Sequence, residues 1–83
     1  MVYVVISDIN YSSDSFLRPD TGTIRFVNKG EIPLPENVDR TVGNHWYNET
    51  YFSDYEKAKT NFKQVENMWQ RRNDAQVSFS DET

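Results

Sequence analysis

The sequence predicts an α+β domain, in which one long helix packs across a small, mainly antiparallel sheet of three or four strands. Three observations lead to this prediction: one long helical period, short β-branched and aromatic runs before it, and turn residues between those runs. The expected element order is β-β-β-α-β, and residues 1–83 form a single domain. A chain this short buries only about 60% of its unfolded surface, so its twelve aromatic residues must supply much of the core.

The first predicted strand covers residues 2–11, VYVVISDINY. Its β-branched residues favour the extended state, and its apolar side chains fall on both faces. We therefore expect a central strand with one face beneath the helix and the other partly covered. Residues 12–21 are predicted to form a polar loop that ends in the turn Pro19-Asp20-Thr21-Gly22, because proline presets φ and glycine permits unusual dihedrals.

Two further strands are predicted before the helix. Residues 22–28 should form the antiparallel neighbour of the first strand, since sequential strands usually pair. Residues 31–45 contain Pro33 and Pro35, which favour an edge segment or a crossing loop because proline cannot donate to a strand ladder. Residues 46–52 form the third strand and lead almost directly into the helix, so the helix should pack across the same sheet.

The helix is predicted between Ser53 and Asn73. Ser53 and Glu56 match a capping box, and Asn73 suits the helix end. Residues 75–80 should add a short last strand, while residues 81–83 should fray. The apolar side chains of the helix recur at spacings of three and four and should form one buried stripe: Tyr55, Ala58, Phe62, Val65 and Trp69.

The net charge of −4 is unevenly distributed. Residues 1–52 carry −3, residues 53–74 carry +1, and the last residues carry −2. This balance argues against binding to duplex nucleic acid, which requires a basic patch. The chain has no cysteine, and it begins without the basic segment and long apolar run of a signal peptide or membrane span. We therefore expect a cytoplasmic protein that does not bind a membrane.

No motif indicates catalysis, a metal site or a cofactor. His45 is the one histidine, and the sequence around it lacks a nucleophile signature. The residues from Asp8 begin like a calcium loop, but Ser13 and Pro19 stand where glycine and glutamate are needed. We therefore predict a protein that is not an enzyme, with no catalytic residue, no metal and no cofactor.

A protein contact surface is the preferred candidate site. Tyr47 and Tyr51 share one strand face with Glu49, and this arrangement suits either an interface or tyrosines packed beneath a loop. Acidic residues on the sheet side and in loops are expected to complete the surface. The predicted partner-binding residues are Asp8, Asp14, Asp20, Glu31, Glu36, Asp39, Tyr47, Glu49 and Tyr51.

In size and composition the chain resembles small stand-alone proteins encoded by phages and other mobile elements. This resemblance implies a protein that binds and inhibits or regulates a host protein, such as a nucleic-acid-binding enzyme, in the manner of anti-CRISPR or anti-restriction inhibitors. Carboxylates that mimic nucleic acid are one version of this hypothesis. One alternative is a homo-oligomeric structural or interaction module. Another is a nucleic-acid binder or small enzyme that uses cations of the helix: Lys59, Lys63, Arg71 and Arg72.

Overall fold

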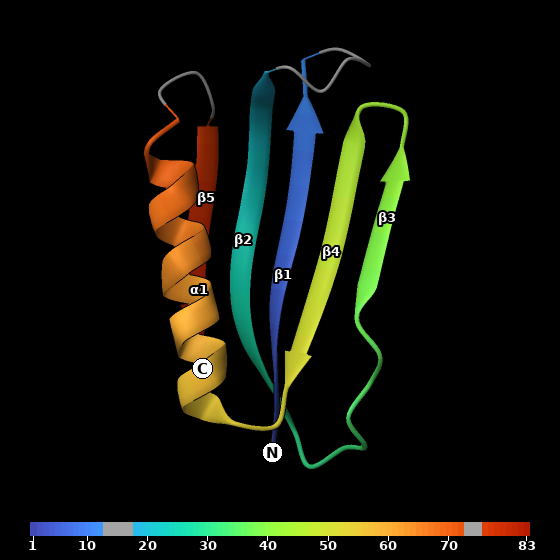
Figure 1. Ribbon diagram of the computed structural model, residues 1–83, viewed down its shortest axis with the longest axis vertical. Coiled ribbons are helices and arrows are strands. Elements are labelled where there is room, and N and C mark those ends of the chain that lie inside the picture. The colour runs from blue at the N-terminus through green and yellow to red at the C-terminus, as the bar shows by residue number, and fades with distance from the viewer. Residues whose placement is uncertain (13–17, 73–75) are drawn as a thin grey trace.

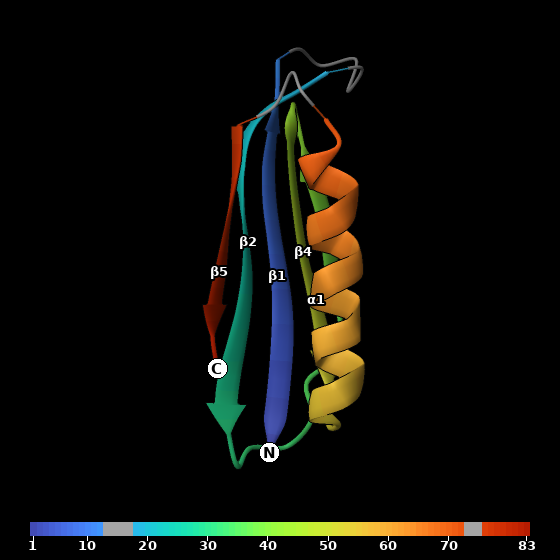
Figure 2. The ribbon, with the colours of Figure 1, turned by 90° about the vertical axis from the view of Figure 1, so that its left-hand side faces the viewer.

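A computed structural model of the protein describes residues 1–12, 18–72 and 76–83. Five strands form one sheet with the order β3-β4-β1-β2-β5, and a single helix crosses one of its faces (Figures 1 and 2). This architecture confirms the α+β class and the central position of the first strand, although the sheet has more strands than predicted. The elements in chain order are β1 (Val2–Tyr11), β2 (Pro19–Gly30), β3 (Val38–Val42), β4 (His45–Phe52), α1 (Tyr55–Gln70) and β5 (Gln76–Glu82).

The sheet is mixed because α1 runs antiparallel to β4 and returns the chain to the end of the sheet where β4 begins, so β5 runs in the same direction as β4. β1 pairs antiparallel with both β2 and β4, and β3 pairs antiparallel with β4. β5 joins the far edge of the sheet and runs parallel to β2. The predicted antiparallel pairing of the first two strands is therefore confirmed, while the parallel pair requires the long connection through the helix.

The core lies between α1 and the face of the sheet that the helix covers. Phe62 of α1 packs against Phe26 of β2, with ring centroids 5.4 Å apart. Tyr55 stacks on the same phenylalanine at 5.8 Å, but it remains partly exposed at the end of the helix. The predicted helical stripe is thus largely correct. The buried cluster consists of Val5, Ile9, Ile24, Phe26, Ala58, Phe62 and Trp69.

The helix boundaries differ from the prediction. The N-cap is Asp54 rather than Ser53: it has an extended backbone, and its carboxylate accepts a hydrogen bond from the Lys57 N–H at 3.2 Å. The capping box assigned to Ser53 is therefore wrong by one residue, because aspartate is an equally good cap and lies next to it. The helix ends at Gln70, and the predicted stop at Asn73 lies outside the described residues.

The turn predicted at residues 19–22 is also wrong, because these residues begin β2. Pro19 is the first residue of the strand, a position where its missing N–H is tolerated. Gly22 pairs with Ile9, and a Cβ atom at this position would lie 2.6 Å from the carbonyl oxygen of Asp8. Glycine is thus required by the close approach of two strands rather than by a turn.

The two edge strands of the sheet are β3 and β5. Residues 31–45 were predicted to form an edge segment or a crossing loop, and both are present. A connection that contains Pro33 and Pro35 leads into the edge strand β3. The predicted fraying of residues 81–83 is wrong for Asp81 and Glu82, which belong to β5. Glu82 pairs in register with Val27 of β2, so the strand extends further than its apolar residues indicate.

Replacement of Trp69 by alanine tests the assigned core. Trp69 is 4% exposed, so we expect Trp69→Ala to lower the free energy of unfolding by about 3–5 kcal/mol. Met68→Ala is the matched control, because the adjacent methionine is 48% exposed and should cost less than about 1 kcal/mol. Urea unfolding followed by circular dichroism measures both values. Equal losses in the two variants would contradict this assignment of the helix face.

Candidate functional site

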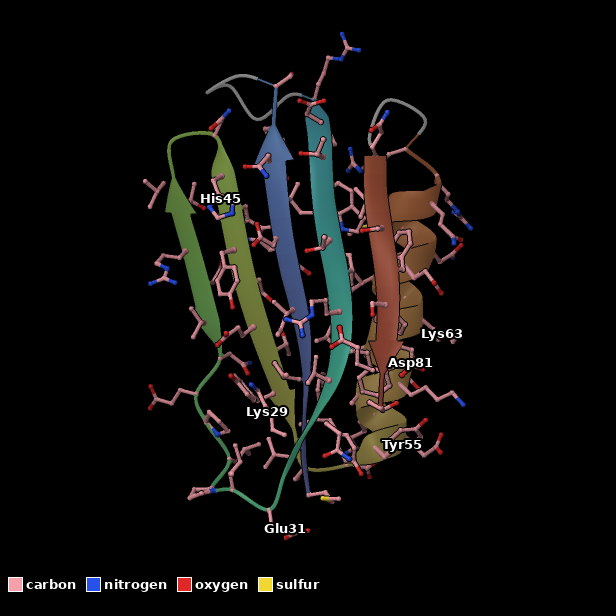
Figure 3. The ribbon with its side chains drawn as sticks, turned by 180° about the vertical axis from the view of Figure 1, so that it is seen from behind. Lys29, Glu31, His45, Tyr55, Lys63 and Asp81 are labelled. Atoms are coloured by element: carbon pink, nitrogen blue, oxygen red, sulfur yellow. The ribbon has the colours of Figure 1, made fainter. Side chains whose placement is uncertain are left out.

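The face of the sheet opposite α1 is the candidate functional site, and the described residues form no helix over it (Figure 3). Alternate residues of a strand point to opposite faces, so Asp8 of β1 lies on this side while Ile9 faces the helix. Strand register places Asp8 beside Tyr47 and Thr23. We call this surface the open face. Its side chains include Val4, Ile6, Asp8, Thr23, Arg25, Val27, Arg40, His45, Tyr47, Glu49, Tyr51, Ser80 and Glu82.

Two tyrosines and one glutamate of β4 form a hydrogen-bonded group on the open face. They lie two residues apart along the strand, which places all three on the same side. The Tyr47 hydroxyl donates to one oxygen of the Glu49 carboxylate at 2.5 Å, and the Tyr51 hydroxyl donates to the other at 3.0 Å. All three residues are half-buried. One carboxylate therefore fixes both phenol groups on the sheet surface.

The hydrogen bonds to Glu49 also keep the phenols neutral. The pKa of Tyr47 is raised to about 12, first by its hydrogen bond to Glu49 and then by burial. The pKa of Tyr51 is raised mainly by burial, with a further contribution from the Glu49 hydrogen bond. Because loss of either proton would place two negative charges side by side, both hydroxyls remain donors near neutral pH.

Two polar side-chain pairs lie beside the tyrosines. Asp8 Oδ1 lies 2.5 Å from His45 Nε2, and both side chains are about two-fifths exposed. The Arg25 guanidinium donates two hydrogen bonds to Glu82, at 2.7 and 2.8 Å. The hydrogen bond from Arg25 lowers the pKa of Glu82 to about 2. The acids of the open face therefore have partners on the same face.

Four of the nine predicted partner-binding residues come together on the open face. Asp8 joins Tyr47, Glu49 and Tyr51 because β1 and β4 are neighbours with Asp8 opposite Tyr47. Asp39 lies on the other face, where its Oδ1 accepts a hydrogen bond from Trp46 Nε1 at 2.7 Å. The predicted acids therefore do not form one continuous patch.

The remaining predicted residues are scattered. Glu31 and Glu36 lie in the connection between β2 and β3, where Glu31 is 3.1 Å from the amino group of Met1. Asp20 is exposed near the start of β2, and Asp14 lies outside the described residues. Local composition grouped these acids, but strand register separates them.

Several residues of the open face were absent from the predicted site. His45 falls in the range 31–45 that was predicted as an edge segment or a crossing loop, whereas it begins β4 and its Nε2 contacts Asp8. Arg25 alternates with the buried Ile24 and Phe26, and this alternation is the sequence signal that agrees with its position on the open face. The pairing of Arg25 with Glu82 had no local signal, because it depends on a parallel strand pair 57 residues apart in sequence.

Residues 1–12, 18–72 and 76–83 contain neither a metal-ligand cluster nor a helix that could span a membrane. In these ranges, no group of three or more His, Asp or Glu side chains is placed to hold a metal ion. The one helix among them is too short and too polar to cross a membrane. Comparisons of this chain with protein-family models, curated proteins and solved structures return no match. The proposed function therefore rests on the open face.

The Arg25–Glu82 pair gives a pH-dependent prediction. A carboxylate with a depressed folded-state pKa contributes stability that is present above its ordinary pKa near 4.5 and is lost as the pH falls toward 2. NMR titration of the Glu82 carboxyl should give a pKa of about 2. Arg25→Gln should raise it toward the ordinary value, whereas Arg71→Gln, a distant arginine, should leave it unchanged. A Glu82 pKa that does not respond to Arg25→Gln would refute the assigned pair.

Proposed function

We propose that this protein is not an enzyme and acts by binding another protein through the open face, thereby inhibiting or regulating it. The supporting observation is the Tyr47–Glu49–Tyr51 group together with the Asp8–His45 contact and the Arg25–Glu82 ion pair on the same face. Tyrosine and arginine are enriched at protein interfaces, because each combines a large contact area with polar groups that can hydrogen-bond. This face offers both residue types on a sheet surface that α1 leaves uncovered.

The open face is held in place before binding. Val4 is fully buried beneath it, so the centre of the surface is packed rather than hollow. The Arg40 guanidinium lies 5.6 Å from the centre of the Tyr47 ring, and Glu49 holds the hydroxyl of the same tyrosine. Side chains that are already fixed lose less conformational entropy on binding. This order favours recognition of a partner by shape and by matched polar groups.

The charge pattern favours a protein partner over mimicry of nucleic acid. A mimic must present unpaired carboxylates to a basic groove, whereas Glu82 is bonded to Arg25 and Asp8 to His45. A surface with paired charges of both signs suits a partner surface that is also mixed in charge. The resemblance in size and composition to mobile-element proteins supports a host protein as that partner, with the interaction taking place in the cytoplasm.

A homo-oligomer is the second candidate, supported by the edge strand β3. This strand ends the described sheet, and Val42 at its end is 70% exposed. Unpaired edge strands are templates for pairing with another chain. Light scattering across a range of concentrations separates the two proposals, because a strict monomer at high concentration removes the oligomer.

The binding proposal is tested by tyrosine variants in an affinity purification. The double variant Tyr47→Ala/Tyr51→Ala should lose the partner that the wild-type protein retains, since central interface tyrosines commonly contribute about 2 kcal/mol or more each. Lys57→Ala/Gln64→Ala on α1 is the control and should retain it. Cross-linking mass spectrometry should place the contacts on β1, β2 and β4.

Circular dichroism of each variant must first show that the fold is intact. Retention of the same partner by the folded tyrosine variant would reject the open face as the binding surface. Recovery of no specific partner by the folded wild-type protein would count against protein binding as the function.

A further inference from the structure

A recess lies on the other side of the sheet from the open face, beside the end of α1. It has a volume of about 400 Å³, within the range of small-molecule pockets. We call it the indole groove, because both tryptophans of the chain contribute to its walls. Its lining residues come from β1, β3, β4, the end of α1 and the residues after it: Tyr11, Thr41, Trp46, Met68, Trp69 and Arg72.

The walls of the indole groove are largely fixed in position. Trp46 is oriented by the 2.7 Å hydrogen bond from its Nε1 to Asp39. Trp69 is 4% exposed, and the Arg72 guanidinium lies 5.1 Å from the centre of its ring. Rigid aromatic walls lose little conformational entropy when an apolar group enters between them. The groove is therefore suited to a ligand with a flat or branched apolar body.

Two polar features of the indole groove indicate which polar group the ligand should carry. Arg72 is the charged side chain in the lining, and it makes no ion pair with any residue in the described ranges. The buried Nε1 of Trp69 also lacks a hydrogen-bond acceptor within those ranges. A buried donor without a partner destabilises the fold. The Arg72 guanidinium calls for an anionic oxygen, and the indole N–H calls for an acceptor.

We infer that the indole groove binds a small carboxylic acid with an aromatic or branched aliphatic body. The body contacts Trp46, Met68 and the Trp69 wall, and the carboxylate lies against Arg72, whose planar guanidinium matches it. The recess has room for one compact group and offers one cation, which favours a small acid over an extended chain. It lies on the opposite side of the sheet from the open face, so this site is independent of the proposed protein contact.

Intrinsic fluorescence provides a direct test, because both tryptophans of the chain line the groove. N-acetyl-L-phenylalanine is the probe, and its uncharged amide, N-acetyl-L-phenylalaninamide, is the matched control. Titration of the full chain with the acid should produce a saturable change in emission. The amide should bind about 5-fold more weakly, since an exposed ion pair contributes up to about 1 kcal/mol.

Two arginine variants locate the carboxylate. Arg72→Gln should raise the Kd of the acid about 5-fold and leave that of the amide unchanged. Arg71→Gln removes the same charge from the adjacent residue, which does not line the groove, and should leave both values near wild type. Two-dimensional NMR spectra of the variants confirm that each remains folded.

Three outcomes would overturn the inference. The first is the absence of a saturable signal up to the solubility limit of the acid. The second is equal affinity for acid and amide, or equal effects of the two arginine variants, because either result would show that Arg72 does not bind a carboxylate. The third is tighter binding of the capped dipeptide N-acetyl-Phe-Glu-amide, which would assign the groove to a peptide segment instead.

Discussion

The fold depends on the contact between Phe62 of α1 and Phe26 of β2. Their rings lie 5.4 Å apart at the centre of the buried cluster, where the helix meets the sheet. This packing holds α1 across the covered face, and the helix in turn carries the chain from β4 to the far edge of the sheet. β5 can then pair parallel to β2. A chain of 83 residues buries a small core, so the loss of this contact would weaken much of the architecture.

β1 carries buried apolar side chains on both of its faces, and each set packs a different face of the sheet. Val5 and Ile9 face the helix and belong to the core, whereas Val4 and Ile6 lie beneath the open face. The buried valine and isoleucine give that face a packed foundation, on which Tyr47 and the charged pairs are arranged. A surface can therefore be ordered without a second helix to cover it. This explains how so small a domain can present a broad, defined contact area.

The open face and the indole groove differ most in their charge balance. On the open face, Arg25 and Glu82 satisfy each other, and the Glu49 carboxylate accepts from two phenols. The groove instead holds an exposed cation, Arg72, and an unpaired donor on Trp69 within the described part of the chain. A balanced surface suits a mixed partner surface, whereas an unbalanced recess suits a ligand of opposite charge. The two proposals thus concern different kinds of ligand at separate places.

Features that depend on a local residue period could be predicted from the sequence. Residue alternation along a strand predicted β1 and the shared face of Tyr47, Glu49 and Tyr51. Spacings of three and four predicted the buried stripe of the helix. Features that depend on pairing between distant segments could not be predicted and became visible in the folded chain. Gly22 lies in a strand at a point where two backbones approach closely. Glu82 belongs to the sheet because it pairs with β2. Register between segments far apart in sequence leaves no local pattern, because its free energy comes from contacts that exist only after the chain has folded.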